Sequence, residues 1–205
     1  MIGIIDYGLG NVRAFSNVYK RLNIDHKLVS APEELYEVSK IILPGVGSFD
    51  YAMTLLNNSG LREGLENKVM VEKVPVLGIC VGMQMLAKSS DEGKLDGLGW
   101  INGHVNKFSF SNEQAHNYPL PHMGWNSLEI KTDDKLFSDL SASPRYYFLH
   151  SYYFQVSAGA QSIATSNYGG EFSCVVKREN IYGIQCHPEK SHHNGVQLLK
   201  NFAEL

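Results

Sequence analysis

The stretch that most constrains the fold is residues 74–86, where an apolar run leads into a cysteine flanked by glycines. Val74–Ile79 has the composition of a buried strand, and from Gly82 onward the apolar residues follow helical spacing. Cys80 has a glycine two residues before it and another two residues after it. A sharp strand-to-helix turn folds such residues against each other and leaves no room for a Cβ. The pattern predicts a cysteine raised from a sheet at a helix N-terminus, where the dipole favours a thiolate.

The first ninety residues repeat this alternation of strand and helix. Short apolar runs are followed by turns and then by segments with apolar residues at helical spacing. Four such alternations predict an α/β fold with a doubly wound, mostly parallel sheet. The expected strands are Met1–Asp6, His26–Ser30, Lys40–Pro44 and Val74–Ile79, and the expected helices are Val12–Leu22, Pro32–Val38, Phe49–Leu56 and Leu61–Val71.

The second half is richer in strands, many of them with β-branched or aromatic residues. Antiparallel strands added to the parallel core explain this change without a second domain, so one domain over residues 1–205 is expected. Residues 109–114 are polar and predict a loop. The expected strands are Trp100–Phe108, Trp125–Lys131, Tyr146–Val156, Ser162–Ser166, Phe172–Lys177 and Ile181–Cys186, with helices at Lys135–Leu140 and Asn194–Leu205.

Two glycine-rich turns follow strands of the predicted sheet. Gly45–Gly47 ends the third strand, where backbone N–H groups can point into the crevice that binds ligands in open α/β sheets. An ordinary strand-to-helix turn explains the same residues equally well. Gly8 and Gly10 suggest a dinucleotide fingerprint, but Arg13 occupies the place of its third glycine, which argues against nucleotide binding.

Composition excludes several classes of protein. A net charge of −3 leaves no basic surface for nucleic acid. Three scattered cysteines are too few for a disulfide framework, which favours a reducing compartment. The chain shows neither a secretory signal nor an apolar run long enough to span a membrane. We therefore expect a cytoplasmic protein that binds neither nucleic acid nor membrane.

A nucleophilic cysteine needs a base and a group that orients the base. His187 is a suitable base, because Pro188 disfavours helix at this residue and favours extended backbone. Residues two apart in an extended segment point the same way, so Glu189 can turn its carboxylate toward the imidazole ring. Cys80, His187 and Glu189 are thus the candidate catalytic residues. The alternative for Cys80 is a small core residue at the end of a strand.

Other histidines offer competing interpretations. His150 lies in an aromatic strand and is a possible rival base, but it lacks an adjacent carboxylate, which favours a structural role. His192 and His193 follow the candidate base closely and raise the possibility of zinc. Their spacing matches no common ligand pattern, so no metal is expected.

These residues resemble the class I (triad) glutamine amidotransferases. The resemblance covers essentially the whole chain and implies a flavodoxin-like fold. The motifs that carry it are Pro44–Gly47, Gly78–Gln84 and His187–Glu189. Three further runs are similar to the glutaminase subunits that serve imidazole glycerol phosphate formation in histidine biosynthesis, namely Pro121–Asn126, Tyr147–Tyr152 and Gln185–Ser191.

The resemblance implies hydrolysis of glutamine to glutamate and ammonia through a glutamyl thioester on Cys80, with no cofactor. His187 would move the protons and Glu189 would orient it. The implied oxyanion hole consists of Gly45, Val46, Gly47 and Val81, and the implied glutamine-binding residues are Gln84, Glu92, Ser151 and Tyr152.

The resemblance also implies a partner, a (β/α)8-barrel cyclase that forms a heterodimer with the chain. The cyclase would use the ammonia to make imidazole glycerol phosphate and the ribotide AICAR. Because free ammonia is wasted, low activity is expected until the partner docks, with the turn at Val46 as the switch. The docking candidates are Asn11, His122, Trp125 and Tyr147.

Two departures from the family pattern leave other functions open. Cys186 stands where an aromatic residue is usual, and Val81 stands where leucine is commoner. Both departures fit a paralogue that supplies ammonia for amidination of a surface-polysaccharide sugar. A cysteine peptidase using the same elbow and a scaffold protein with an inactive site are further alternatives.

Overall fold

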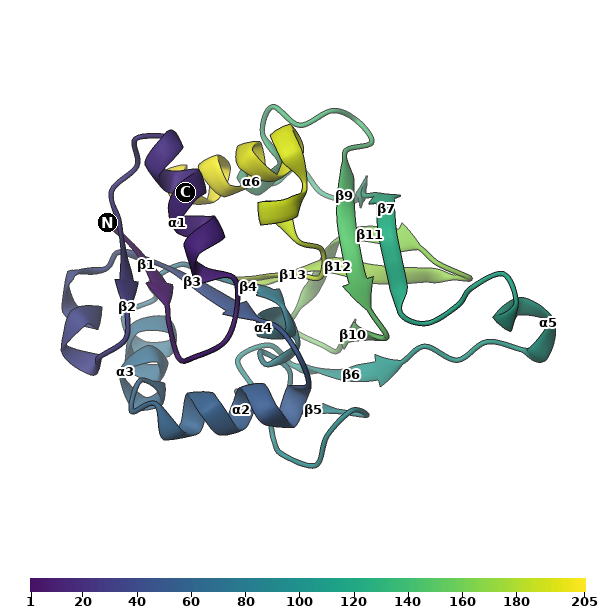
Figure 1. Ribbon diagram of the computed structural model, residues 1–205, viewed down its shortest axis with the longest axis horizontal. Helices are drawn as coiled ribbons and strands as arrows, with labels where there is room; N and C mark the ends of the chain where they lie inside the picture. Colours follow the sequence, from purple (N-terminus) through teal and green to yellow (C-terminus); the bar gives the residue numbers. More distant parts are fainter.

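A computed structural model describes residues 1–205 and contains one twisted eleven-stranded sheet (Figure 1). Its first part is parallel, in the order β2-β1-β3-β4-β13. Every residue of β1, β4 and β13 is buried, as expected for strands covered on both faces. The bounds are β1 Ile2–Ile5, β2 His26–Val29, β3 Lys40–Gly45, β4 Val76–Cys80 and β13 Ile181–Ile184. The predicted doubly wound α/β core is confirmed.

Helices cover the two faces of this parallel part. Figure 1 shows α1 (Val12–Arg21) and α6 (His192–Glu204) on one side of the sheet. On the other side lie α2 (Phe49–Asn58) and α3 (Arg62–Glu66), and α3 continues into a π-helical turn at Asn67–Val71. None of the helices has both the length and the apolar composition needed to cross a membrane.

The second half of the chain extends the sheet mainly with antiparallel strands, as predicted. They are β12 (Glu171–Arg178), β10 (Tyr152–Val156), β6 (Gly103–Lys107) and β5 (Ser89–Ser90), with β11 (Gln161–Asn167) and β8 (Glu129–Ile130) at the side of β12. A separate antiparallel pair consists of β7 (His122–Ser127) and β9 (Arg145–His150), which stands upright in Figure 1. The remaining short helices are η1 (Pro32–Glu37), α4 (Val81–Gln84), α5 (Asn112–Ala115), η3 (Lys135–Phe137) and η4 (Pro188–Lys190).

Two of the predicted strands are interrupted. The segment 146–156 is divided at Ser151, because its first part pairs with β7 and its second part pairs with β6 and β12 of the large sheet. The segment 125–131 is likewise divided between β7 and β8. Periodicity cannot reveal such a break, since the residues on both sides remain strand-like.

Two helical predictions also differ from the structure. The helix expected from Gly82 onward is a single turn, because the backbone after it bonds to a later loop. The Leu98 N–H donates to the Met85 carbonyl at 2.8 Å, and the Ile101 N–H donates to the Leu86 carbonyl at 3.0 Å. Conversely, the segment predicted as a loop runs into α5, whose N-terminus has a capping box between Ser111 and Gln114.

The turn suggested as a dinucleotide fingerprint has a packing explanation. Gly10 has a φ of +93°, a conformation that favours glycine. A Cβ on this residue would lie 2.7 Å from the Cβ of Pro44, at the end of β3. The glycine therefore allows this loop to approach the neighbouring strand closely.

Close backbone contacts shape the turn at Cys80. A Cβ on Gly78 would lie 2.6 Å from the carbonyl oxygen of Gly82. A Cβ on Gly82 would lie 2.0 Å from the carbonyl oxygen of Leu43, and one on Gly45 would lie 2.3 Å from the Gly82 nitrogen. Glycines on both sides of the cysteine therefore let β4 and α4 fold onto each other and onto β3, as the sequence pattern predicts.

Replacing Gly82 by alanine should destabilise the protein, because the new methyl group would overlap backbone that is fixed in the sheet. We expect a loss of about 1–3 kcal/mol in the free energy of unfolding, measured by urea denaturation. The matched control is Gly170→Ala, since a Cβ at that position would meet no atom within 4 Å. Equal stability of the two variants would contradict the close approach.

Candidate active site

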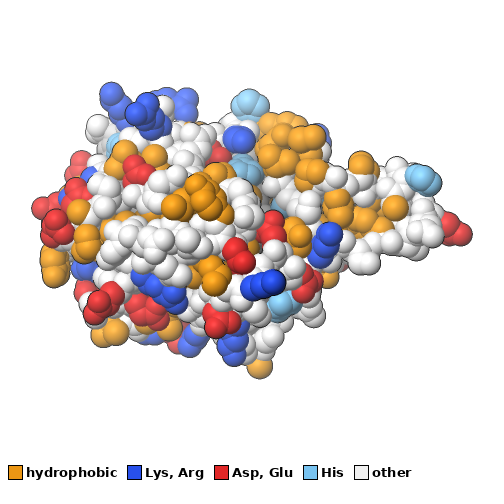
Figure 2. Space-filling view, turned by 60° about the horizontal axis from the view of Figure 1, so that its bottom comes forward, with side chains coloured by type: hydrophobic (Ala, Val, Ile, Leu, Met, Phe, Trp, Pro, Cys, Tyr) orange, Lys and Arg blue, Asp and Glu red, His pale blue; other side chains and the backbone are white.

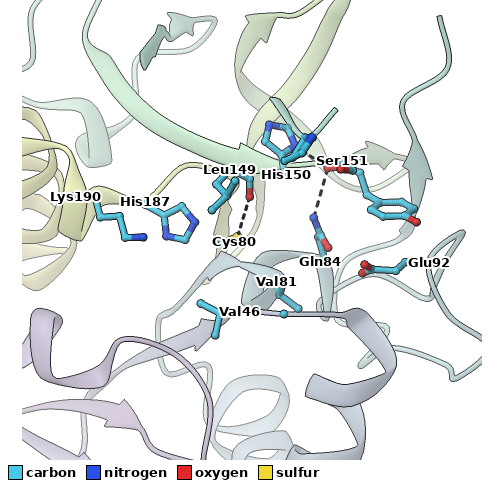
Figure 3. A pocket seen from close by; sticks show the side chains of 13 residues that line it. Val46, Cys80, Val81, Gln84, Glu92, Leu149, His150, Ser151, His187 and Lys190 are labelled. Carbon is cyan, nitrogen blue, oxygen red and sulfur yellow. Dashed lines mark hydrogen bonds between the residues drawn. The ribbon is translucent and has the colours of Figure 1, made fainter. Parts of the chain in front are cut away.

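Cys80 lies at the end of β4 and faces a pocket formed by loops at the carboxyl ends of the parallel strands (Figure 3). Its backbone has φ 55° and ψ −114°, a strained conformation for a residue with a side chain. The thiol is 4.0 Å from the carbonyl oxygen of Leu149, and the Gln185 amide nitrogen lies 3.8 Å from Sγ. The elbow thus raises the sulfur from the sheet into the pocket.

His187 and Glu189 form a buried pair next to this thiol. The His187 Nδ1 atom is 2.9 Å from Glu189 Oε1, and the two side chains are only 5% and 2% exposed. The other carboxylate oxygen, Oε2, is buried without a hydrogen-bond partner, so His187 is the only protein group bonded to this carboxylate. Since Nδ1 faces the carboxylate, Nε2 remains for the sulfur.

The local backbone fixes the orientation of His187. It has φ −105° and ψ 90°, in agreement with the extended geometry predicted from Pro188. The His187 N–H donates to the Tyr147 carbonyl at 2.8 Å, and the Ser191 hydroxyl donates to the His187 carbonyl at 2.6 Å. Glu189 belongs to the helical turn η4, so its carboxylate reaches the ring from that turn and not from a continued strand.

The surroundings of His187 favour its charged form. Burial alone lowers the pKa of His187, but the interactions with Cys80 and Glu189 outweigh it, the latter through its hydrogen bond at 2.9 Å and its negative charge. The net effect raises the pKa of His187 to about 10. The site can therefore hold an imidazolium between a carboxylate and a sulfur.

The pocket has a volume of about 470 Å³, within the range of small-molecule sites. It contains Cys80 and His187, all four residues expected to bind glutamine, and three of the four expected in the oxyanion hole (Figure 3). Gly45 does not line it, because this residue packs against Gly82. The lining consists of Val46, Gly47, Cys80, Val81, Gln84, Glu92, Pro121, Leu149, His150, Ser151, Tyr152, His187 and Lys190.

The turn at Val46 and Gly47 carries two backbone N–H groups that donate to no other protein atom. Gly47 has a φ of +82°, and the Val46 side chain is 37% exposed. Val81 faces the same part of the pocket from the start of α4 (Figure 3). Such free donors near a nucleophile are suited to stabilising negative charge on oxygen.

The opposite end of the pocket contains Gln84 and Glu92. Gln84 Nε2 donates to Gln185 Oε1 at 3.0 Å and to the Tyr152 carbonyl at 3.4 Å. Glu92 accepts the Phe49 N–H at 2.9 Å. Burial raises the pKa of Glu92, the Phe49 N–H opposes this shift and the charge of Asp50 adds to it.

Asp50 holds the loop that carries Glu92. Its carboxylate accepts the Lys94 N–H at 2.9 Å and the Leu95 N–H at 3.1 Å. Residue 93 must be a glycine, because a Cβ at this position would lie 1.9 Å from Asp50 Oδ1. The Glu92 carboxylate of the loop therefore bonds to backbone in the first turn of α2, and the Asp50 carboxylate of α2 bonds to backbone in the loop. No pattern in the sequence indicates this reciprocal contact.

Several residues of the site were not predicted from the sequence. Leu149 and Lys190 line the pocket, and Gln185 is a buried residue whose amide nitrogen lies next to Cys80 Sγ. Gln185 could have been found, since a residue two positions before His187 on an extended segment faces the same way. The same alternation directs Cys186 away from the pocket. Its thiol is fully buried, and this burial raises its pKa well above the ordinary value.

The docking candidates fall into two groups. Asn11 and Trp125 are exposed and Tyr147 is half-buried. His122 is only 4% exposed and bonds to His150 and Asn126, so the prediction that it lies on an accessible docking face was wrong. Strand β7 alternates its side chains, and His122 is on its inner side.

His150 is placed for a structural role, as predicted. One ring nitrogen bonds to His122 and the other to the Tyr152 carbonyl, so neither is left for the Cys80 thiol. Burial lowers the pKa of His150 to about 3 despite the bond to Tyr152. No group of three or more His, Cys, Asp or Glu side chains is arranged to hold a metal ion.

Glu189→Gln should lower the pKa of His187 from about 10, because it removes the negative charge that the imidazolium faces. The raised pKa makes a contribution to stability that is full below pH 6.5, the ordinary value, and is lost as the pH rises to about 10. The stability difference between wild type and Glu189→Gln should therefore shrink across this range. NMR titration of His187 and urea unfolding against pH measure the two effects. Glu179→Gln, which removes a surface carboxylate paired with Lys73, is the control and should leave the titration of His187 unchanged.

Comparisons with known proteins agree with this geometry. The sequence pattern of the family described as "Glutamine amidotransferase class-I" matches residues 3–205. The chain is 54% identical to "Imidazole glycerol phosphate synthase subunit HisH" of Bdellovibrio bacteriovorus and 53% identical to the protein of that name from Leptospira interrogans. Both alignments cover 100% of each chain.

Solved structures show the same fold at low sequence identity. A structure described as a glutamine amidotransferase has a TM-score of 0.76 at 20% identity and covers 100% of this chain and 99% of its own. A structure described as PurLQS from Thermotoga maritima has a TM-score of 0.74 at 16% identity, covering 99% of this chain and 97% of its own. Together with the match over residues 3–205, these findings identify the chain as a member of the class-I glutamine amidotransferase family.

Proposed function

We propose that the chain is the glutaminase subunit of an imidazole glycerol phosphate synthase, where it supplies ammonia for histidine biosynthesis. The observation that carries this proposal is the thiol of Cys80 beside the buried His187–Glu189 pair in a pocket large enough for an amino acid. Full-length relatives at 52–54% identity bear the name of this synthase, which gives the proposal its pathway.

The first half-reaction forms a thioester. Cys80 Sγ attacks the side-chain amide carbon of glutamine after its proton passes to His187 Nε2. The tetrahedral intermediate collapses when the imidazolium protonates the amide nitrogen and the carbon–nitrogen bond breaks, which releases ammonia. Glu189 stabilises the imidazolium between these two transfers, which agrees with the raised pKa of His187.

The second half-reaction hydrolyses the thioester. His187 takes a proton from water and the resulting hydroxide attacks the carbonyl carbon. The carbon–sulfur bond then breaks, glutamate leaves, and the imidazolium returns the proton to Cys80 Sγ. In both halves negative charge develops on the carbonyl oxygen. Backbone N–H groups of Val81 and of the Val46–Gly47 turn stabilise it, and one such donor typically contributes about 3 kcal/mol to lowering the barrier.

The far end of the pocket binds the amino-acid part of glutamine. The Glu92 carboxylate pairs with the α-amino group, and Gln84 with the backbone of Ser151 and Tyr152 supplies further hydrogen bonds. This division is supported by their shared position on the side of the pocket away from His187 (Figure 3). It orients the side-chain amide toward the sulfur.

The partner is a (β/α)8-barrel cyclase that forms a heterodimer with this chain in the cytoplasm. Figure 2 shows hydrophobic side chains gathered over the region of β7 and β9. This region adjoins the pocket, because Leu149 and His150 of β9 line it. Met123 is 64% exposed and Trp125 is 41% exposed, although both are apolar. Exposed apolar patches of this kind mark protein interaction sites. Docking there covers the pocket and retains ammonia, and it acts on the turn at Val46.

The alternative acceptor, a surface-polysaccharide sugar, is not favoured. The relatives at 52–54% identity carry the name of the histidine-pathway synthase. Of the two departures that suggested a paralogue, Cys186 lies in the core and does not line the pocket. Val81 does line the pocket, but the proposed contact is made by its backbone N–H and does not depend on its side chain.

Cys80→Ala should abolish glutamine-dependent turnover of the assembled synthase and leave ammonia-dependent turnover intact, because only ammonia production needs the thiol. A coupled assay with glutamine or ammonium salt as nitrogen source measures both rates. A glutamine-analogue electrophile should label wild type and not the variant. Cys174→Ala, a buried cysteine outside the pocket, is the control and should keep both activities. Unchanged glutaminase activity in Cys80→Ala would contradict the mechanism.

The acceptor is tested with the chain purified in complex with its native partner. We expect a phosphoribosyl imidazole precursor to stimulate glutamine hydrolysis by at least about tenfold over the isolated chain, as when docking shifts a site between inactive and active states. A nucleotide- or lipid-linked sugar should have no effect. Stimulation by the sugar alone would show that the chain supplies ammonia to the alternative acceptor. Equal turnover with and without the partner would contradict the role of docking.

A further inference from the structure

Two buried histidines outside the catalytic pair contact each other next to the pocket. His122 lies on β7 and His150 ends β9, and the two rings meet edge to face with centroids 5.0 Å apart. His122 Nδ1 is 3.0 Å from His150 Nε2. The proposed chemistry uses neither ring, so the contact requires its own explanation.

The donor direction of this contact can be deduced from Asn126. Asn126 Oδ1 accepts the Ser127 N–H at 2.8 Å, and Asn126 Nδ2 donates to the Asn167 carbonyl at 2.8 Å. These two bonds fix the amide orientation, so Nδ2 is also the donor toward His122 Nε2 at 3.3 Å. The proton of His122 is therefore on Nδ1 and is donated to His150 Nε2.

The hydrogen bonds continue in the same donor direction from His150 to the pocket. Because its Nε2 accepts, the proton of His150 is on Nδ1, which donates to the Tyr152 carbonyl at 2.7 Å. Gln84 Nε2 donates to that same carbonyl at 3.4 Å. A one-directional series of hydrogen bonds thus runs from Asn126 to the carbonyl that also holds Gln84.

The surroundings keep both rings neutral, as this series requires. Burial lowers the pKa of His122 to about 4. The pKa of His150 is lowered to about 3, mainly by burial, with the Tyr152 carbonyl opposing the shift and His122 and His187 adding to it. A second proton on His150 Nε2 would face the Nδ1–H group of His122, and a second proton on His122 Nε2 would face the amide N–H of Asn126. The enclosing aromatic side chains are Phe108, Phe148, Tyr168 and Phe172.

We infer that His122 and His150 are positioning residues that fix the Tyr152 carbonyl and, through it, Gln84 for binding glutamine. This inference rests on the proposed glutaminase function. The one-directional series ends at the Tyr152 carbonyl, at the binding end of the pocket. Its only further connection to Cys80 runs through Gln84 and Gln185, whose amide nitrogen is 3.8 Å from the sulfur. Loss of the series should therefore weaken glutamine binding and leave the chemical steps nearly unchanged.

The test measures KM and kcat for glutamine hydrolysis in the assembled complex. His150→Phe removes the donor to Tyr152 and should raise KM about three- to tenfold with kcat within about twofold of wild type. His150→Asn places an amide nitrogen near the position of Nδ1 and should recover most of this loss. His122→Phe should raise KM less than His150→Phe does. His116→Phe is the control, because the His116 side chain is exposed and lies outside the pocket.

A second measurement is independent of activity. Nitrogen-15 NMR of the wild-type chain should show His122 and His150 neutral, with the proton on Nδ1 in both rings. A proton on Nε2 of His150, or an unchanged KM in His150→Phe while Cys80→Ala abolishes turnover, would overturn this inference alone. An equal fall of kcat in His150→Phe and His150→Asn would indicate general disorder and would also overturn it. Absence of glutamine hydrolysis by the wild-type complex would overturn the proposed function and this inference together.

Discussion

The close approach of three backbone segments at the elbow is the constraint on which the rest of the site depends. Gly78, Gly82 and Gly45 lie so near to neighbouring backbone that none has space for a Cβ. This contact allows Cys80 to adopt its positive φ and holds the sulfur above the sheet. The cost of the strained residue is offset by the rigid packing of β3, β4 and α4 around it, so the nucleophile keeps a fixed position.

His187 and His150 are both buried, but their environments shift their pKa values in opposite directions and give them different roles. His187 faces a carboxylate and a thiol, and its pKa is raised to about 10. His150 is buried among aromatic rings, bonds to a neutral histidine, and has a pKa lowered to about 3. Burial acts in the same direction on both rings. The negative charge beside His187 therefore decides which histidine carries a proton.

The pocket brings together loops that are far apart in the sequence. Its nucleophile ends β4 and its base follows β13. Its binding residues come from α4, from the junction of β9 and β10 and from the loop after β5. The parallel order places the ends of β3, β4 and β13 at one edge of the sheet. The antiparallel additions then close the side of the crevice, and the exposed residues of β7 lie next to its mouth.

Short-range patterns in the sequence were sufficient to predict the parallel α/β core, the elbow at Cys80 and the pairing of His187 with Glu189. The patterns are apolar periodicity, glycine spacing and the effect of Pro188 on the preceding residue. The break at Ser151, the burial of His122 and the contact between Asp50 and the loop carrying Glu92 became visible only in the folded chain. These features depend on which distant segments meet, and no local pattern carries that information, because strand pairing and burial are set by contacts between residues remote in the chain.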